Sequence, residues 1–231
     1  MATGTAVEVF YAEDARDRFA DLLDPAQESG VPVSAVTTRA IRSLSDTVTP
    51  AGVVAVCRSL VLGPDHELAG GARSGVPRLV AVGQALAEPG NVGTLIRVSD
   101  ALGVDAVWLT EGAVDPENAK AVRASAGSLF HLPVVRGIAE ADVVARARAQ
   151  GLQVAVATAD GEVDVEHADE QLARPTAWIF GNEAHGVPAA LAEAADLRVR
   201  IPIRGRAESL NIVTAASICL HTSARLQGAG S

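Results

Sequence analysis

Cysteine is scarce in this chain of 231 residues, which contains only Cys57 and Cys219. The two thiols are far apart in the sequence and have no pair of histidines near them. The sequence therefore predicts neither a disulfide framework nor a structural zinc site. We expect both cysteines to be buried, unpaired thiols.

Long hydrophobic runs are also missing. Apolar residues make up 48% of the chain, yet an aliphatic stretch such as AGVVAV at residues 51–56 is far shorter than the roughly 18 to 20 residues that span a bilayer. The N-terminal segment lacks the basic and then apolar pattern of a secretory signal. These absences predict a cytoplasmic protein without a membrane helix.

Positive charge is in short supply. The formal net charge is −9, and Lys120 is the only lysine among 19 basic residues. A surface that binds nucleic acid indiscriminately carries excess Lys and Arg, so the charge balance argues against such binding. A local basic groove remains compatible with this net charge, and arginine suits bidentate contacts with phosphate.

The organisation of the chain changes near residue 62. Residues 1–62 alternate short strand-like and helix-like segments and predict a small α/β domain. The segment at 63–77 has a high density of Gly and Pro without apolar periodicity, which is typical of a linker. A larger domain is expected over residues 78–231.

In this larger domain, strands that are apolar on both faces alternate with helices, which predicts an α/β fold with a mostly parallel sheet flanked by helices. Ligands of such sheets bind at the carboxyl ends of the strands, where polar loops should gather. The expected strands are 78–84, 106–111, 132–135, 152–159, 176–181 and 197–203. The expected helices are 91–103, 118–127, 139–151, 188–195 and one that begins at residue 209.

The first polar loop runs into the helix at residues 91–103. Asn91 is predicted to cap this helix, and the open helix N-terminus could hold an anion. Arg97 follows within the helix, where a solvated surface arginine is the plain alternative. Gly90, Gly93 and Gly103 do not have the spacing of a dinucleotide fingerprint, which disfavours a Rossmann dehydrogenase.

The second loop, WIFGNEAHGVP, spans residues 178–188. Gly181 lets another group approach the backbone closely. The carboxylate of Glu183 beside exposed amides suits an organic ligand, or a hydrogen-bonded loop that holds a pocket in shape. Glu183 and His185 have no third metal ligand at a suitable spacing, so we expect no metal site.

The third loop precedes the last helix. Ile201 and Ile203 offer apolar surface, and Ser209 and Asn211 stand where the helix is expected to begin. An ordinary N-cap is the plain alternative for Ser209. A nucleophilic role for Ser209 is not supported, because the sequence suggests no Ser/His/Asp arrangement.

Four segments together resemble a known family: PGNVGTLIRVSDALG, VRASAGSLFHLPV, FGNEAHGVP and IPIRGRAESLNIVTAASI. They are similar, in this order, to the motifs of SPOUT-class methyltransferases of the SpoU or TrmH type. The resemblance runs from residue 77 to residue 225. It implies transfer of a methyl group from S-adenosylmethionine to a ribose 2′-hydroxyl in RNA, and a SPOUT fold with a deep C-terminal trefoil knot, a rare exception to unknotted chains.

The resemblance also implies roles for particular residues and a homodimer formed through the knotted domain. The residues implied to bind the cofactor are Thr158, Gly161, Gly181, Asn182, Glu183, Gly186, Ile201, Ile203, Ser209 and Leu210. The residues implied to be catalytic are Asn91, Arg97, Glu183, Ser209 and Asn211. Those implied to contact RNA are Asn91, Arg97 and Arg123. Since a guanidinium stays protonated in proteins, we interpret Arg97 as an electrostatic group more than as a literal base.

Residues 1–62 resemble the later part of the ribosomal-protein-like substrate domain found in many members of the family, which favours ribosomal RNA as the substrate. Transfer RNA and a non-catalytic RNA-binding module are the alternatives. A redox enzyme with a nucleotide cofactor is disfavoured by the missing glycine fingerprint.

Overall fold

The computed structural model describes residues 4–67, 76–182 and 184–228. The chain divides into two compact units, Met1–Leu60 (unit 1) and Val61–Ser231 (unit 2). Within the described residues, no helix is both long enough and apolar enough to span a bilayer.

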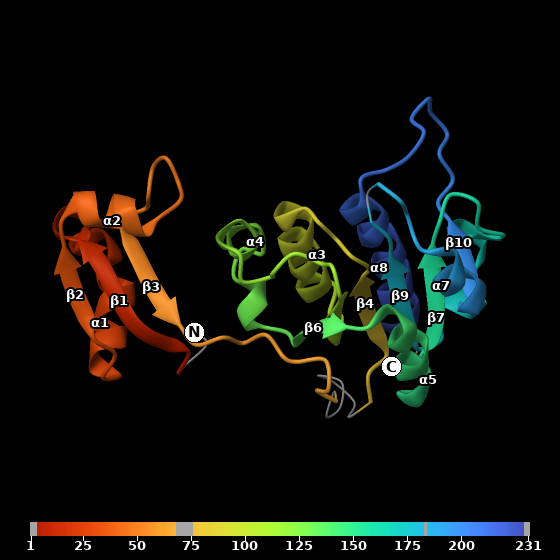
Figure 1. The fold of residues 1–231 in the computed structure, drawn as a ribbon, viewed down its shortest axis with the longest axis horizontal. Coiled ribbons are helices and arrows are strands. Elements are labelled where there is room, and N and C mark those ends of the chain that lie inside the picture. Colours follow the sequence, from red (N-terminus) through yellow and green to blue (C-terminus); the bar gives the residue numbers. More distant parts are fainter. Residues whose placement is uncertain (1–3, 68–75, 183, 229–231) are drawn as a thin grey trace. The chain divides into compact units, whose positions relative to one another are not determined.

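Unit 1 contains a three-stranded mixed sheet in the order β2-β1-β3, with β1 parallel to β2 and antiparallel to β3 (Figure 1). Two short helices accompany it. The elements are β1 (Ala6–Ala12), α1 (Ala20–Glu28), β2 (Val33–Val36), α2 (Thr38–Leu44) and β3 (Val53–Cys57).

The core cluster of unit 1 is small and consists of buried Ala12, Ala15 and Ile41. Cys57 is exposed, so the expectation that it is buried is wrong. The reason is its position: it ends β3, a strand at the edge of the sheet. Cys219, in unit 2, is buried as predicted.

Unit 2 contains a seven-stranded sheet in the order β6-β5-β4-β9-β7-β10-β8. The pairings between its strands are parallel, which confirms the predicted fold class. The short strand β8 was not predicted. The strands are β4 (Leu79–Gly83), β5 (Ala106–Thr110), β6 (Val134–Ile138), β7 (Gln153–Ala157), β8 (Val163–Asp164), β9 (Thr176–Phe180) and β10 (Leu197–Arg200).

Helices pack on both faces of this sheet. Alternate residues of a strand point to opposite faces, so Leu79 and Ala81 join one core cluster while Val80 and Val82 join the other. Helices α3 and α8 contribute to the first cluster and α5 to the second. The helices of unit 2 are α3 (Pro89–Ala101), α4 (Ala119–Ala124), α5 (Val143–Ala149), α6 (Asp169–Leu172), α7 (Ala189–Ala194) and α8 (Ile212–Gly228). Short 3-10 turns in the two units span Glu13–Ala15, Asp17–Phe19, Ser128–Phe130, Glu140–Asp142 and Val165–His167.

A buried tryptophan fastens α8 to the sheet. The indole Nε1 of Trp178, in β9, donates a hydrogen bond of 2.9 Å to Ser223 Oγ in α8. The ring also stacks on Phe180, with 6.1 Å between ring centroids. Because both partners of the hydrogen bond are fully buried, this contact fixes the helix against the middle of the sheet.

Candidate active site

The candidate site lies at the carboxyl edge of the sheet of unit 2. Strands β4, β9, β7 and β10 are consecutive neighbours and parallel, so the loops that follow them emerge at the same edge. The chain adds β5 and β6 on one side of β4 and the later strands on the other side, beginning with β9 as the direct neighbour of β4. Open α/β sheets bind ligands at such a switch point between neighbouring strands. The predicted site residues on the first, second and third loops follow these strands.

Helix α3 begins earlier than expected, at Pro89. Glu88 is its N-cap, and the Glu88 carboxylate accepts a hydrogen bond of 3.2 Å from the backbone N–H of Gly90. The prediction that Asn91 caps this helix is therefore wrong. Proline is well placed at the first helical position, and the extended residue before it takes the cap. Asn91 lies in the first turn, with its backbone N–H bonded to the Glu88 carbonyl at 3.0 Å.

The fold brings Asn91 and Asn211 together although 120 residues separate them. The Asn211 Nδ2 donates to Asn91 Oδ1 at 3.3 Å, while Asn211 Oδ1 accepts from the backbone N–H of Val213 at 2.9 Å. Asn211 thus caps α8. The expectation that this helix begins at Ser209 is wrong, and so is the alternative that Ser209 is its cap. Ser209 is exposed in the loop before the helix.

Arg97 is exposed on α3, and within the described residues its side chain makes no hydrogen bond or ion pair. Arg123 is exposed on α4, the helix packed against α3. The packing is close because Gly93 has no side chain: a Cβ there would lie 2.1 Å from the Ala121 carbonyl oxygen. Gly93 thereby holds the helices that carry the two arginines in contact.

The loop after β9 is a tight turn. Asn182 and Gly186 exchange two backbone hydrogen bonds of 3.0 and 2.8 Å, and a Cβ at Gly181 would lie 2.2 Å from the Gly186 carbonyl carbon. The Asn182 side chain donates to the Ala85 carbonyl at 2.7 Å and so joins this turn to the loop after β4. Glu183 lies outside the described residues.

The loops after β7 and β10 are joined to each other. Thr158 donates its backbone N–H to the Val199 carbonyl at 2.9 Å, which extends the β7–β10 ladder by one residue. Gly161 lies directly on β10, since a Cβ there would meet the backbone of Val199 at 2.7 Å. The structure thus places both predicted residues of the β7 loop against the strand that leads to Ile201.

Aliphatic side chains are exposed beyond this strand. Ile203 and Leu210 are 38% and 37% exposed, whereas most large hydrophobic side chains of unit 2 are buried. Ile201 is half-buried and packs on the core. Exposed aliphatic groups beside polar loops can hold an aromatic ring, because covering them removes apolar area from water.

Two residues that the sequence did not reveal join the site. Lys120 Nζ lies 2.5 Å from Glu88 Oε1. This hydrogen bond, followed by the one from Gly90, lowers the pKa of Glu88. The Glu-Pro pair before the helix was a readable signal for Glu88 as a cap. Lys120 had no such signal, because its partner is 32 residues away.

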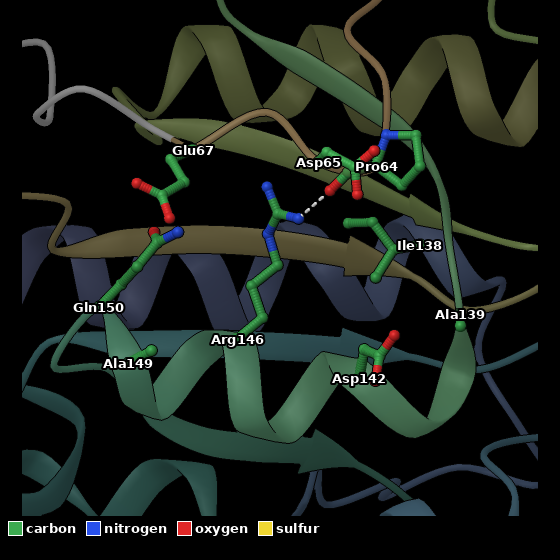
Figure 2. Close-up of a pocket in the computed structure, with 9 residues that line it drawn as sticks. All are labelled: Pro64, Asp65, Glu67, Ile138, Ala139, Asp142, Arg146, Ala149 and Gln150. Carbon is green, nitrogen blue, oxygen red and sulfur yellow. Dashed lines mark hydrogen bonds between the residues drawn. The ribbon is translucent and has the colours of Figure 1, made fainter.

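A separate cavity of about 470 Å³ lies between residues 64–67, the end of β6 and α5 (Figure 2). None of the predicted site residues lines it. Arg146 reaches from α5 to the carbonyls of Pro64 and His66, and its guanidinium lies 5.0 Å from the Trp108 ring centroid. Desolvation lowers the pKa of Arg146. These contacts hold residues 64–66 against α5 within unit 2. Within the described residues, no group of three or more candidate metal ligands occurs.

Comparison with known proteins gives matches over both units. The model of the SpoU rRNA methylase family matches residues 78–221, and that of RNA 2′-O ribose methyltransferase substrate binding matches residues 3–61. The Bacillus subtilis protein named 23S rRNA (guanosine(2553)-2′-O)-methyltransferase RlmP is 36% identical over 194 residues, which cover 84% of this chain and 73% of the relative.

Solved structures agree. The SpoU methyltransferase AviRb from Streptomyces viridochromogenes, in complex with AdoMet, matches with a TM-score of 0.83 and 26% identity over 99% of this chain and 86% of that one. A structure described by its role in 2′-OH methylation of C/U34 on tRNA matches with a TM-score of 0.58 and 25% identity, over 67% of this chain and 99% of that one. The chain is a member of the SpoU rRNA methylase family.

Proposed function

We propose that this protein transfers a methyl group from S-adenosylmethionine to a ribose 2′-hydroxyl of ribosomal RNA. The observation that carries the proposal is the match of two family models to both units, one for the methylase and one for substrate binding. Relatives such as the Bacillus subtilis protein, named as 23S rRNA 2′-O-methyltransferases, support it.

Ribosomal RNA is favoured over transfer RNA by coverage. The tRNA-related structure is matched over 99% of its own length by only 67% of this chain, so about one third of this chain has no counterpart there. The AviRb structure, by contrast, covers 99% of this chain. We assign RNA substrate binding to the domain at residues 1–62, which is joined by a linker at 63–77 to the methyltransferase domain at 78–231.

The residues at the carboxyl edge fit S-adenosylmethionine. When bound, this cofactor supplies a methyl group carried on a positively charged sulfur. Ile203 and Leu210 offer the exposed aliphatic surface that an adenine ring would cover. The other residues that we assign to the cofactor lie in the loops after β7, β9 and β10 and before α8: Thr158, Gly161, Gly181, Asn182, Glu183, Gly186, Ile201 and Ser209.

Arg97 is the proposed electrostatic group. A guanidinium remains protonated at neutral pH, so it stabilises the negative charge that develops on the attacking sugar oxygen and can grip a neighbouring phosphate. Its exposure on α3 leaves it accessible to RNA. Arg123, on the adjoining helix, is proposed as a second phosphate contact.

Asn91 and Asn211 are proposed to orient the ribose. Their carboxamides are already in contact, and neutral groups do not repel a polyanion as carboxylates would. Ser209, in the exposed loop before α8, is proposed to complete this site, and Glu183 to hold the second loop in shape.

The proposal includes two further structural features. The segment that follows β10 is proposed to be threaded as a deep trefoil knot, and the protein is proposed to form a homodimer through α8. Small, partly exposed residues of α8, Ala215 and Ser217, allow a second copy to approach closely. A soluble RNA substrate is consistent with action in the cytoplasm.

Transfer is tested by incubating the full chain with labelled S-adenosylmethionine and, separately, with unmodified ribosomal RNA and transfer RNA, followed by mapping of 2′-O-methylated nucleotides. We expect label on one ribose of ribosomal RNA. Label confined to transfer RNA would overturn the substrate assignment, and label on a base would overturn the reaction.

A further inference from the structure

Arg198 lies in β10, the strand between β7 and β8, and it is in register with Val156 of β7. The loop that joins β7 to β8 must therefore cross β10. It does so at Gly161, where a Cβ would lie 2.7 Å from the Arg198 carbonyl oxygen and 2.7 Å from the Arg200 nitrogen. The crossing leaves no space for a side chain.

One guanidinium holds this crossing loop at two points. Arg198 donates to Asp160 at 2.6 Å through one terminal nitrogen and to Glu162 at 2.7 Å through the other. The two carboxylates stand on either side of Gly161. The fork of an arginine suits such two-point contacts, which a lysine ammonium cannot reproduce with the same geometry.

The contacts continue to the first residue of the loop. Thr158 Oγ1 donates to the second oxygen of Asp160 at 2.5 Å. This hydrogen bond, followed by the one from Arg198, lowers the pKa of Asp160. Arg200 adds a longer bond of 3.3 Å to the Gly161 carbonyl. Thr158, Asp160 and Glu162 are thus all linked, directly or through one bond, to Arg198.

The position of this network connects it to the cofactor. Thr158 begins the crossing loop, Gly161 lies where the loop meets β10, and Ile201 follows the last residue of β10. The crossing loop is fastened to Arg198, which precedes Ile201 by three residues. Exposed ion pairs contribute little to global stability, so the consequence of losing this one is a change in local geometry.

We propose that Arg198 is a positioning residue, which clamps the Thr158–Glu162 loop onto β10 through Asp160 and Glu162 and thereby sets the width of the cofactor pocket. This inference depends on the proposed function, because it takes both loops to border S-adenosylmethionine. Arg198 acts through the loop and does not touch the reacting atoms.

The test compares Arg198→Met, Arg198→Lys and the unaltered full chain. We expect Arg198→Met to raise the Kd for S-adenosylhomocysteine and the KM for S-adenosylmethionine by about ten-fold. The kcat at saturating cofactor and the KM for RNA should stay within about two-fold, since the groups at the ribose are unchanged. Arg198→Lys should rescue the affinity only in part.

A matched control lies at the other end of the same strand pair. Arg148 donates to Asp196 at 3.1 Å, just before β10 begins, and Asp196 accepts from the Val154 backbone at 2.8 Å. Arg148→Met removes a comparable exposed ion pair far from the carboxyl edge. It should leave the cofactor affinity unchanged.

A second variant, at the two exposed carboxylates, keeps the test valid if Arg198→Met fails to fold. Asp160 and Glu162 side chains are 74% and 65% exposed, so the pair Asp160→Asn with Glu162→Gln should fold and show the same loss of cofactor affinity. Adding Arg198→Met to this pair should cause little further loss, because the three groups act as one unit.

The outcomes separate the two proposals. If the unaltered chain binds S-adenosylhomocysteine and neither Arg198→Met nor the carboxylate pair weakens it beyond two-fold, the clamp is overturned while the proposed function stands. A fall in kcat without a change in cofactor affinity would overturn the clamp as well. If the unaltered chain does not bind S-adenosylhomocysteine, the proposed function fails and the clamp with it.

Discussion

Unit 1 and unit 2 differ in how many hydrophobic side chains each buries in its core. The core cluster of unit 1 consists of Ala12, Ala15 and Ile41, whereas unit 2 has two extensive clusters, one on each face of a seven-stranded sheet. Small domains bury a smaller fraction of their surface and are marginally stable. Chemistry that requires precise geometry is therefore supported by unit 2, while unit 1 has little core to support it.

The units differ in the same way in their proposed roles. The residues assigned to the cofactor and to catalysis all lie in unit 2, while unit 1 matches only the model for substrate binding. Replacing residues of unit 1 should therefore weaken RNA binding and leave the affinity for the cofactor intact.

The largest expected effect is on transfer. Arg97→Ala should lower kcat by about a hundred- to a thousand-fold, because it removes the cation that stabilises the developing negative charge. The affinity for S-adenosylhomocysteine, measured by calorimetry, should be nearly unchanged. Arg174→Ala replaces another exposed arginine of unit 2 and should keep full activity. Lost cofactor affinity in the Arg97 variant would contradict the assignment.

The second effect contrasts the two thiols. Burial raises the pKa of Cys219 to about 12, so at pH 8 only about one thiol in ten thousand is ionised, and the thiolate is the reactive form. Cys57 is exposed, and partial desolvation raises its pKa too. A chromogenic disulfide reagent should label one thiol in the native protein and two after denaturation. Cys57→Ser should remove the native reaction, and a persistent fast phase would show that unit 2 opens readily.

The third effect concerns the two cores. Ile41→Ala in unit 1 and Ile179→Ala in unit 2 each remove a buried side chain, and each should cost about 2–5 kcal/mol. This loss should exceed the free energy of unfolding of unit 1, so Ile41→Ala should unfold unit 1 alone. Unit 2 should stay folded in either variant. Hydrogen exchange of the β1 amides reports the unfolding of unit 1, and hydrogen exchange of the β9 amides reports the unfolding of unit 2. Val48→Ala, at a fully exposed position, should change the free energy of unfolding by less than about 0.5 kcal/mol.

The smallest effect concerns α8. Ser223→Ala leaves the buried indole N–H of Trp178 without its partner and should destabilise unit 2 by about 1–3 kcal/mol in denaturant unfolding. Ser43→Ala is the comparison in unit 1, since its hydroxyl bonds the Arg39 carbonyl at the surface. Equal effects of the two variants would show that the Trp178 contact does not fix α8.

Most elements were predictable because their signals are local. The apolar strands and the helices between them agree with the structure, apart from the short β8 and α6. The errors fell at element boundaries. Glu88 caps α3 where Asn91 was expected, Asn211 caps α8 where Ser209 was the alternative, and β6 spans Val134–Ile138 where a strand was expected at 132–135. Several residues there could cap a helix, and the choice between them depends on how the chain enters the helix.

Local sequence patterns specify the alternation of strands and helices, the parallel class of the sheet and the clustering of polar groups after strands, because hydrophobic periodicity is a property of neighbouring residues. The packing of the folded chain is what brings Asn91 to Asn211, Lys120 to Glu88 and Arg198 to the loop crossing β10. These pairs join residues far apart in the chain. Their contact depends on the order of strands in the sheet, which local patterns do not specify.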